Sequence, residues 1–88
     1  MNPSSLYNHP DPKIYWRCRR GMLELDLMLQ GFYYHKNYAS SSASAKQAFL
    51  RLLDYPDTLL LELLLGQTIS SDEEIQRVIQ QIRAVVTH

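Results

Sequence analysis

The chain has 88 residues, enough for one small domain with a thin hydrophobic core. Nine basic and nine acidic residues cancel, and this neutrality disfavours a nucleic-acid binder, because such proteins usually carry net positive charge. The charge is uneven along the chain, however. Four cations and no anion lie in residues 13–20, and six acids and no cation lie in residues 54–74, so the sequence has a basic start and an acidic second half.

The single cysteine, Cys18, excludes an internal disulfide, and with only three scattered histidines it cannot form a zinc site. The longest apolar run is broken at Glu62 and is far too short for a membrane span. The N-terminus has neither a secretory nor a transit pattern. We therefore expect a metal-free cytoplasmic protein without a membrane span.

Residues 1–10 are polar and contain prolines, and we expect them to form a flexible tail before a helical domain over residues 11–88. Apolar residues recur at helical spacing, and no segment alternates with period two. The fold class is therefore all-α, a single-domain bundle of about five helices. The predicted helices cover about residues 12–19, 22–35, 42–54 and 56–66, and a last one follows Ser71.

Several residues have the chemistry of helix ends. Asp11 before Pro12 is a favourable helix start, and Gly66 is suited to the position just after a helix. Residues 37–44 are rich in serine and predict a loop that ends in a helix cap. Ser71 and Glu74 have the spacing of a capping box.

Three helices show a continuous apolar face, which predicts the core. The predicted core residues are Met22, Leu25, Leu29, Phe32 and Tyr33; Ala45, Ala48, Phe49, Leu52 and Leu53; and Ile75, Val78, Ile79, Ile82 and Val85 or Val86.

No residue pattern indicates catalysis. The histidines lie in the tail, at a helix end and at the last residue, and the three glycines stand apart, so no phosphate-binding loop is present. Cys18 has four cations nearby in sequence and could be a reactive thiol, but its place on an apolar stripe favours a core residue. We expect no catalytic residue.

The aromatic residues allow two interpretations. They could form a stacking platform for bases, but such residues more often close the edges of a small helical core, and we favour core and rim. The residues concerned are Trp16, Phe32, Tyr33, Tyr34 and Tyr38.

The most unusual stretch is Trp16–Asp26, which reads W-R-C-R-R-G-M-L-E-L-D. Arg20 and Glu24 are four residues apart and can pair if the second helix begins early, which would make this an ordinary helix start. That account leaves Gly21 unexplained. A residue without a side chain between an arginine and a glutamate leaves a notch that another backbone can approach. The residues alone favour these two interpretations equally.

This stretch closely resembles the R-G-x-x-E signature region of the SdhE (YgfY-type) FAD assembly factors, the succinate dehydrogenase flavinylation factors. The segments Phe32-Tyr33-x-His35 and Phe49–Asp54 are also similar to the family, and the resemblance covers about residues 14–85. It implies a five-helix bundle that is not an enzyme. Such proteins bind the flavoprotein subunit of succinate dehydrogenase, and in some bacteria that of fumarate reductase, and promote covalent attachment of FAD to a histidine of that subunit.

The resemblance also implies which residues bind the partner. Arg20, Gly21 and Glu24 are the signature positions, and we expect them to face outward as a docking notch. The flanking matches are Arg19, Met22 and Asp26. Trp16 matches the aromatic residue before them, and we expect Trp16 and Cys18 to anchor the first helix. The protein is expected to act as a monomer and to bind no cofactor stably by itself, the FAD being that of the client.

Other functions remain as alternatives. The same family has been described as the antitoxin of a toxin–antitoxin pair, and the basic stretch 13–20 with its tyrosines allows a small helical nucleic-acid binder. A protein that binds FAD in its own right is a third hypothesis, but no dinucleotide fingerprint supports it.

Overall fold

The computed structural model describes residues 11–86, so the expected flexible tail over residues 1–10 lies outside the described residues. Within that range all regular structure is helical, which confirms the all-α class. The helices are α2 (Pro12–Arg17), α3 (Leu23–Tyr33), α4 (Lys36–Ala39), α5 (Ala43–Leu52), α6 (Asp57–Leu64) and α7 (Glu73–Val86). None of these helices is long and apolar enough to cross a membrane.

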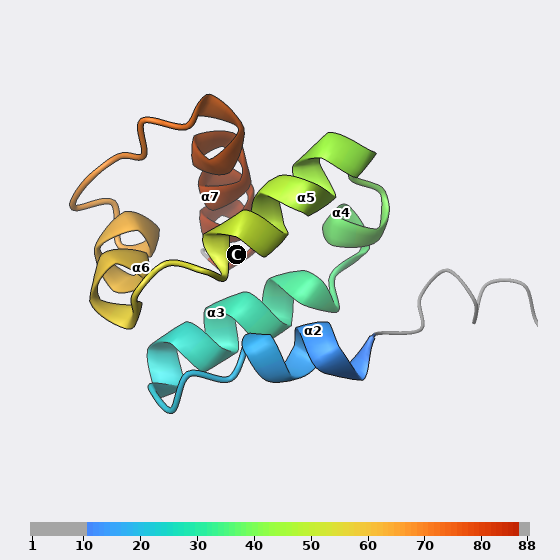
Figure 1. Ribbon diagram of the computed structural model, residues 1–88, viewed down its shortest axis with the longest axis horizontal. Helices are drawn as coiled ribbons and strands as arrows, with labels where there is room; N and C mark the ends of the chain where they lie inside the picture. Colours follow the sequence, from blue (N-terminus) through green and yellow to red (C-terminus); the bar gives the residue numbers. More distant parts are fainter. Residues whose placement is uncertain (1–10, 87–88) are drawn as a thin grey trace, which may run out of the picture.

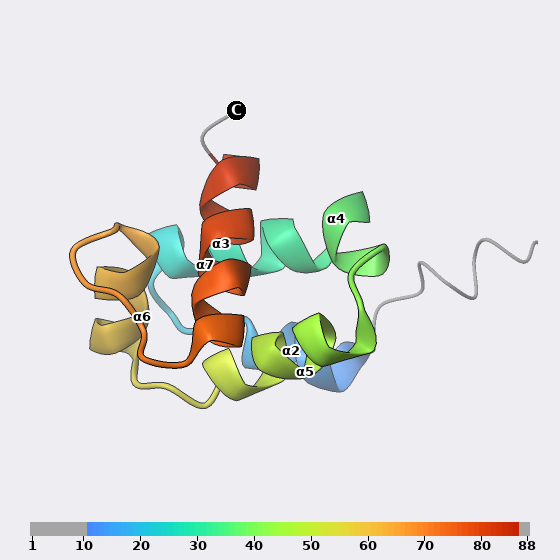
Figure 2. The same cartoon turned by 90° about the horizontal axis from the view of Figure 1, so that it is seen from above.

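The C-terminal helix α7 is the centre of the bundle, because it packs against α3, α5 and α6. In Figure 1 α2 lies beside α3, and α5 crosses on the other side of α3. Figure 2, turned by 90°, shows the loop between α2 and α3 on the same side of the molecule as α6, and α4 on the opposite side.

The predicted core faces are confirmed. Fully or nearly fully buried are Leu25, Leu29, Phe32 and Tyr33 of α3, Ala48, Phe49, Leu52 and Leu53 of α5 and its end, and Ile75, Val78, Ile79 and Ile82 of α7. Leu60, Leu63 and Leu64 of α6 join them. Met22, Ala45 and Val85 are partly buried against this cluster. Most of the buried apolar surface therefore comes from α3, α5, α6 and α7, whereas α2 contains no buried side chain.

Three predicted helix ends are confirmed. The Asp11 carboxylate accepts the amide hydrogen of Lys13 at 2.9 Å, and the Ser42 hydroxyl accepts that of Ala45 at 3.1 Å. Gly66 has φ +78°, and the amide of Gln67 closes the end of α6 on a carbonyl one turn back. These short-range hydrogen bonds fix where the helices begin and end.

The capping-box assignment for the last helix is wrong by one residue. Asp72, and not Ser71, caps α7: its Oδ1 accepts the amide hydrogens of Glu74 at 3.0 Å and of Ile75 at 3.2 Å. A carboxylate that accepts two amide hydrogens at the positive end of a helix binds more strongly than a neutral hydroxyl, so the aspartate takes the cap position.

The serine-rich segment 37–44 is not entirely a loop, because it contains most of α4. The His35 Nδ1 atom accepts the amide hydrogen of Asn37 at 3.0 Å and caps this helix. The hydroxyls of Ser40 and Ser41 donate to the Asn37 carbonyl. α3 accordingly ends at Tyr33, two residues before the predicted end, and a helix of four residues is too short to show an apolar period.

The cap at Asp72 predicts how stability depends on pH. Hydrogen bonds from the Ile75 amide and from the Arg51 guanidinium hold the pKa of Asp72 below its usual range. The unfolded-state pKa is therefore the higher one, and the carboxylate stabilises the fold above about pH 4 and loses this effect as the pH falls through the folded-state pKa.

We expect Asp72→Asn to lower the thermal midpoint at pH 7 and Asp72→Ala to lower it further, because alanine also removes the cap oxygen. The gap between the wild type and Asp72→Asn should close towards pH 3. Circular dichroism melts at both pH values test this. An unchanged gap would show that the charge of Asp72 does not stabilise α7.

Candidate functional site

The α2–α3 loop, residues 18–22, contains two of the three signature positions, Arg20 and Gly21, and the third, Glu24, lies in the first turn of α3. Gly21 has φ +78°, a conformation that costs other residues about 1 kcal/mol or more. The Asp26 carboxylate, in the first turn of α3, accepts the amide hydrogen of Arg20 at 2.5 Å. The turn therefore has one backbone conformation that glycine permits and the aspartate selects.

The Arg20 guanidinium points into the protein. Its side chain is only 17% exposed; it donates to the Leu53 carbonyl and forms an ion pair with Asp57 at 3.3 Å. The Nε atom is buried without a hydrogen-bond partner among the described residues. Arg20 thus joins the α2–α3 loop to the connection between α5 and α6, more than thirty residues further along the chain.

One expectation for Arg20 is wrong, and one of the two interpretations left open for this stretch is excluded. Arg20 does not face outward, because a carbonyl at the end of α5 and a carboxylate at the start of α6 both lie within reach of its fork of donors. It also does not pair with Glu24, because α3 begins only at Leu23 and the loop directs Arg20 elsewhere. The arginine of the signature is a structural residue in this fold.

Gly21 is exposed, and a Cβ atom added to it would meet no atom within 4 Å. No neighbour in the described part of the chain therefore requires a missing side chain here, and the positive φ of Gly21 is what favours glycine. The space beside it is open, so a partner can still approach.

Of the six predicted partner-binding residues, Arg19 and Glu24 present exposed side chains, and Gly21 adds exposed backbone. Arg20, Met22 and Asp26 are partly buried and turn towards the fold. The structure therefore divides the predicted set into residues that fix the loop and residues that a partner can touch.

Trp16 does not anchor α2, because its side chain is 62% exposed and the Arg19 guanidinium lies over its ring at 5.5 Å. Cys18 is fully buried, as expected for a core residue. Burial raises the pKa of its thiol to about 12, although Arg20 and Arg17 act in the opposite direction. At neutral pH the thiol is protonated and is not a nucleophile.

The aromatic residues divide between core and surface. The rings of Phe32, Tyr33, Tyr38 and Phe49 contact one another inside the bundle. Tyr34 is 56% exposed. The core-and-rim interpretation is thus confirmed for most of them, with Trp16 and Tyr34 left at the surface.

The basic stretch 13–20 is partly neutralised by the acidic second half of the chain. Arg17 pairs with Asp54 at 2.6 Å and donates to the Leu50 carbonyl, and Arg20 pairs with Asp57. With half of its four cations paired, the stretch offers a nucleic acid a weaker field than the sequence indicates.

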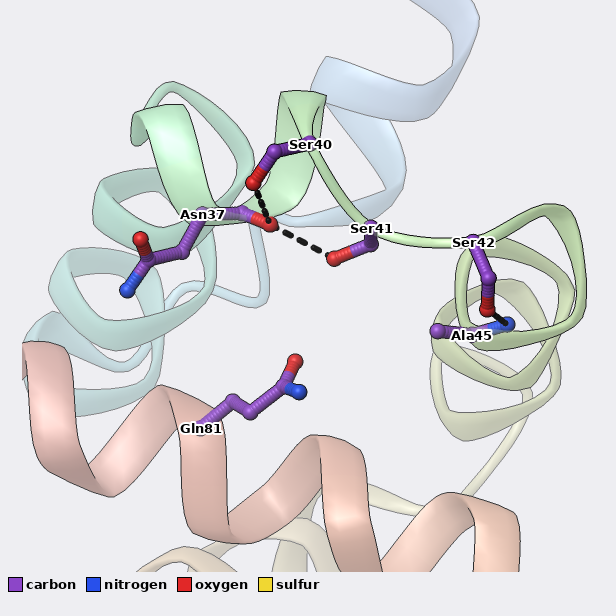
Figure 3. Close-up of a pocket in the computed structure, with 6 residues that line it drawn as sticks. All are labelled: Asn37, Ser40, Ser41, Ser42, Ala45 and Gln81. Atoms are coloured by element: carbon purple, nitrogen blue, oxygen red, sulfur yellow. Dashed lines mark hydrogen bonds between the residues drawn. The ribbon is translucent and has the colours of Figure 1, made fainter.

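A recess lies between the α4–α5 connection and α7, away from the α2–α3 loop. Figure 3 shows this recess of about 390 Å³, which is lined by Asn37, Ser40, Ser41, Ser42, Ala45 and Gln81. The Ser40, Ser41 and Ser42 hydroxyls already bond to backbone atoms. All lining groups are neutral, and within residues 11–86 no cluster of three or more His, Cys, Asp or Glu could hold a metal ion.

Sequence reasoning missed the exposed apolar side chains of α3, Leu23 and Leu27. A signal was available: they are four residues apart, as are Leu25 and Leu29 of the core, so α3 is apolar on two sides.

The two adjacent arginines allow a matched stability test. Arg20→Ala should lower the free energy of unfolding by about 1–3 kcal/mol, because the Leu53 carbonyl and Asp57 lose a charged donor. The free energy of unfolding of Arg20→Lys should lie between those of the wild type and Arg20→Ala, since lysine keeps the charge but lacks the planar fork of donors. Arg19→Ala is the control and should change stability by less than about 0.5 kcal/mol. Urea unfolding measures all three, and equal effects of Arg19→Ala and Arg20→Ala would contradict a structural role for Arg20.

Comparison with known proteins gives one consistent result. The family model described as "Flavinator of succinate dehydrogenase" matches residues 12–86. The chain is 45% identical over 71 residues to the FAD assembly factor SdhE of Coxiella burnetii, which covers 81% of this chain and 85% of the relative. It is 38% identical over 72 residues to the FAD assembly factor SdhE of Yersinia pseudotuberculosis, and this match covers 82% of this chain and 81% of the relative. It is 39% identical over 74 residues to the FAD assembly factor SdhE of Methylococcus capsulatus, and this match covers 84% of this chain and 88% of the relative.

No solved structure matches the chain. The family model, by contrast, spans all six helices of the described residues 11–86 and the whole α2–α3 loop, and the relatives are aligned over most of their length. The chain belongs to the family of succinate dehydrogenase flavinators.

Proposed function

We propose that this protein binds the flavoprotein subunit of succinate dehydrogenase and promotes the covalent attachment of FAD to it. The observation that carries the proposal is the family match over residues 12–86, together with relatives named FAD assembly factors at up to 45% identity. The fumarate reductase flavoprotein is the second client that we propose. The protein acts in the cytoplasm as a monomer and leaves the flavin with its client.

The α2–α3 loop supports this role because it is fixed before any partner arrives. Asp26 holds the Arg20 amide, and the Arg20 side chain is held by the start of α6. A loop that is already ordered loses less conformational freedom on binding than a mobile one. Arg19, Gly21 and Glu24 are then presented to the client in one geometry.

The proposed mechanism is positioning. The one thiol of the chain is buried and protonated, and no residue of the loop is placed to act as a nucleophile or a base. Docking would hold the flavoprotein so that its own histidine, FAD and catalytic groups are aligned, and alignment alone can lower a barrier by several kcal/mol. The bond to the flavin is made by the client.

The function is tested by in-gel flavin fluorescence of the flavoprotein in cells that lack this protein. Covalent flavin should be strongly reduced and restored by the wild-type gene. Gly21→Arg should fail to restore it, because the arginine fills the open space beside the loop. Gly21→Ala has the same strained φ but adds one methyl group, and it should restore most of the signal.

Two results would contradict the proposal. Undiminished covalent flavin in the deleted cells would show that the protein is not needed for flavinylation. Full rescue by a stably expressed Gly21→Arg variant would show that no partner approaches the loop at this residue.

A further inference from the structure

Four large apolar side chains are exposed on α2 and α3. Trp16, Leu23, Leu27 and Tyr34 are 62%, 73%, 63% and 56% exposed, and we call them the apolar stripe. A small protein that acts alone rarely leaves so many large apolar groups in water on two adjacent elements.

The stripe residues of α3 lie on one side of the helix. Leu23, Leu27 and Tyr34 are spaced i, i+4 and i+11, so they lie within about one-ninth of a turn of each other around the helix axis. Leu25 and Leu29 point into the core from the opposite side. α3 therefore buries one apolar face in its own bundle and leaves a second one free for a partner.

Trp16 extends this surface from α2. The Asp11 amide donates to the Tyr33 hydroxyl at 2.7 Å, which fixes the start of α2 beside the end of α3. The Tyr15 ring lies 5.4 Å from that of Tyr34 and 6.0 Å from that of Trp16. A row of rings thus connects Tyr34 to Trp16.

Opposite charges flank the stripe. Arg19 lies on the α2 side, with its guanidinium over the Trp16 ring. Glu24 and Tyr33 are nine residues apart and therefore point to opposite sides of α3, and α2 lies on the Tyr33 side. Glu24 consequently marks the other flank, so the surface has a cation on one edge and an anion on the other.

We infer that the apolar stripe is the main contact surface for the client flavoprotein, which would present a row of apolar side chains with a carboxylate facing Arg19 and a cation facing Glu24. This inference rests on the proposed function. The client is the occupant because the family is described by its action on succinate dehydrogenase, and because the stripe is continuous with Arg19 and Glu24, the predicted site residues that remain exposed.

The distribution of binding energy follows from burial. Apolar area removed from water supplies most of the free energy of association, and exposed Trp, Tyr and Arg are the residue types that dominate interfaces. Trp16, with Arg19 over its ring, is the strongest single contact of this kind. Charges at the rim mainly set orientation and the association rate. Arg20 acts only as a positioning residue.

The test measures binding of the purified FAD-free flavoprotein subunit to the full chain. Leu27→Glu places a charge in the stripe and should weaken binding by about tenfold or more. Ile69→Glu is the matched control, because Ile69 is 77% exposed but lies between α6 and α7. Both variants should melt close to the wild type, since neither side chain is buried.

A second readout uses the single tryptophan of the chain. With 5-fluorotryptophan incorporated, Trp16 gives one ¹⁹F resonance, which should shift or broaden when the flavoprotein is added. The shift should persist in Ile69→Glu and be lost at the same concentrations in Leu27→Glu.

The outcomes separate the two proposals. If the wild type binds and supports flavinylation but Leu27→Glu binds equally well, the stripe is not the contact surface and the proposed function stands. If the wild type neither binds nor supports flavinylation, the proposed function fails and the inference fails with it. If light scattering shows a wild-type dimer that Leu27→Glu dissociates, the stripe binds a second copy, which overturns the assignment to the client.

Discussion

The attachment of Arg20 to the end of α5 and the start of α6 fixes the α2–α3 loop, on which most of the predicted site residues lie. α2 has only six residues and no fully buried side chain, so it would not be stable as an isolated helix. Ile14 and Tyr15 pack partly against the core, and hydrogen bonds tie its start to Tyr33 and Arg17 to Leu50 and Asp54. The loop that follows adds to these contacts, because Cys18 enters the core and the Arg20 guanidinium reaches the Leu53 carbonyl and Asp57. Together they fix the exposed residues of α2 relative to α3.

The attachment of Arg20 separates two roles that lie side by side in the signature region, fixing the loop and offering side chains to a partner. Arg20 and Asp26 hold the backbone of the loop from inside, and Gly21 permits its conformation. Arg19 and Glu24 remain free to contact a partner. Loss of activity in an Arg20 variant would therefore report a displaced surface and not a lost contact, which is why stability and binding have to be measured together.

The sequence predicted the parts of the structure that depend on local chemistry. The apolar period placed the core faces of three helices, and Asp11, Ser42 and Gly66 marked helix ends, because each acts within one turn of itself. It failed for α4, which at four residues is too short for an apolar period to repeat. It also failed for Arg20 and Trp16, since whether a side chain turns inward depends on groups far along the chain.

The pairing of charges explains why a neutral chain with a basic start can expose a largely apolar surface on α2 and α3. Asp54 and Asp57 are the first two acids of the acidic second half, and the fold brings them to Arg17 and Arg20. Charges that look like two separated blocks in sequence therefore neutralise each other near the loop. A surface with few free charges attracts partners weakly over long distances, so a partner of the apolar stripe would be selected by the fit of apolar side chains at short range.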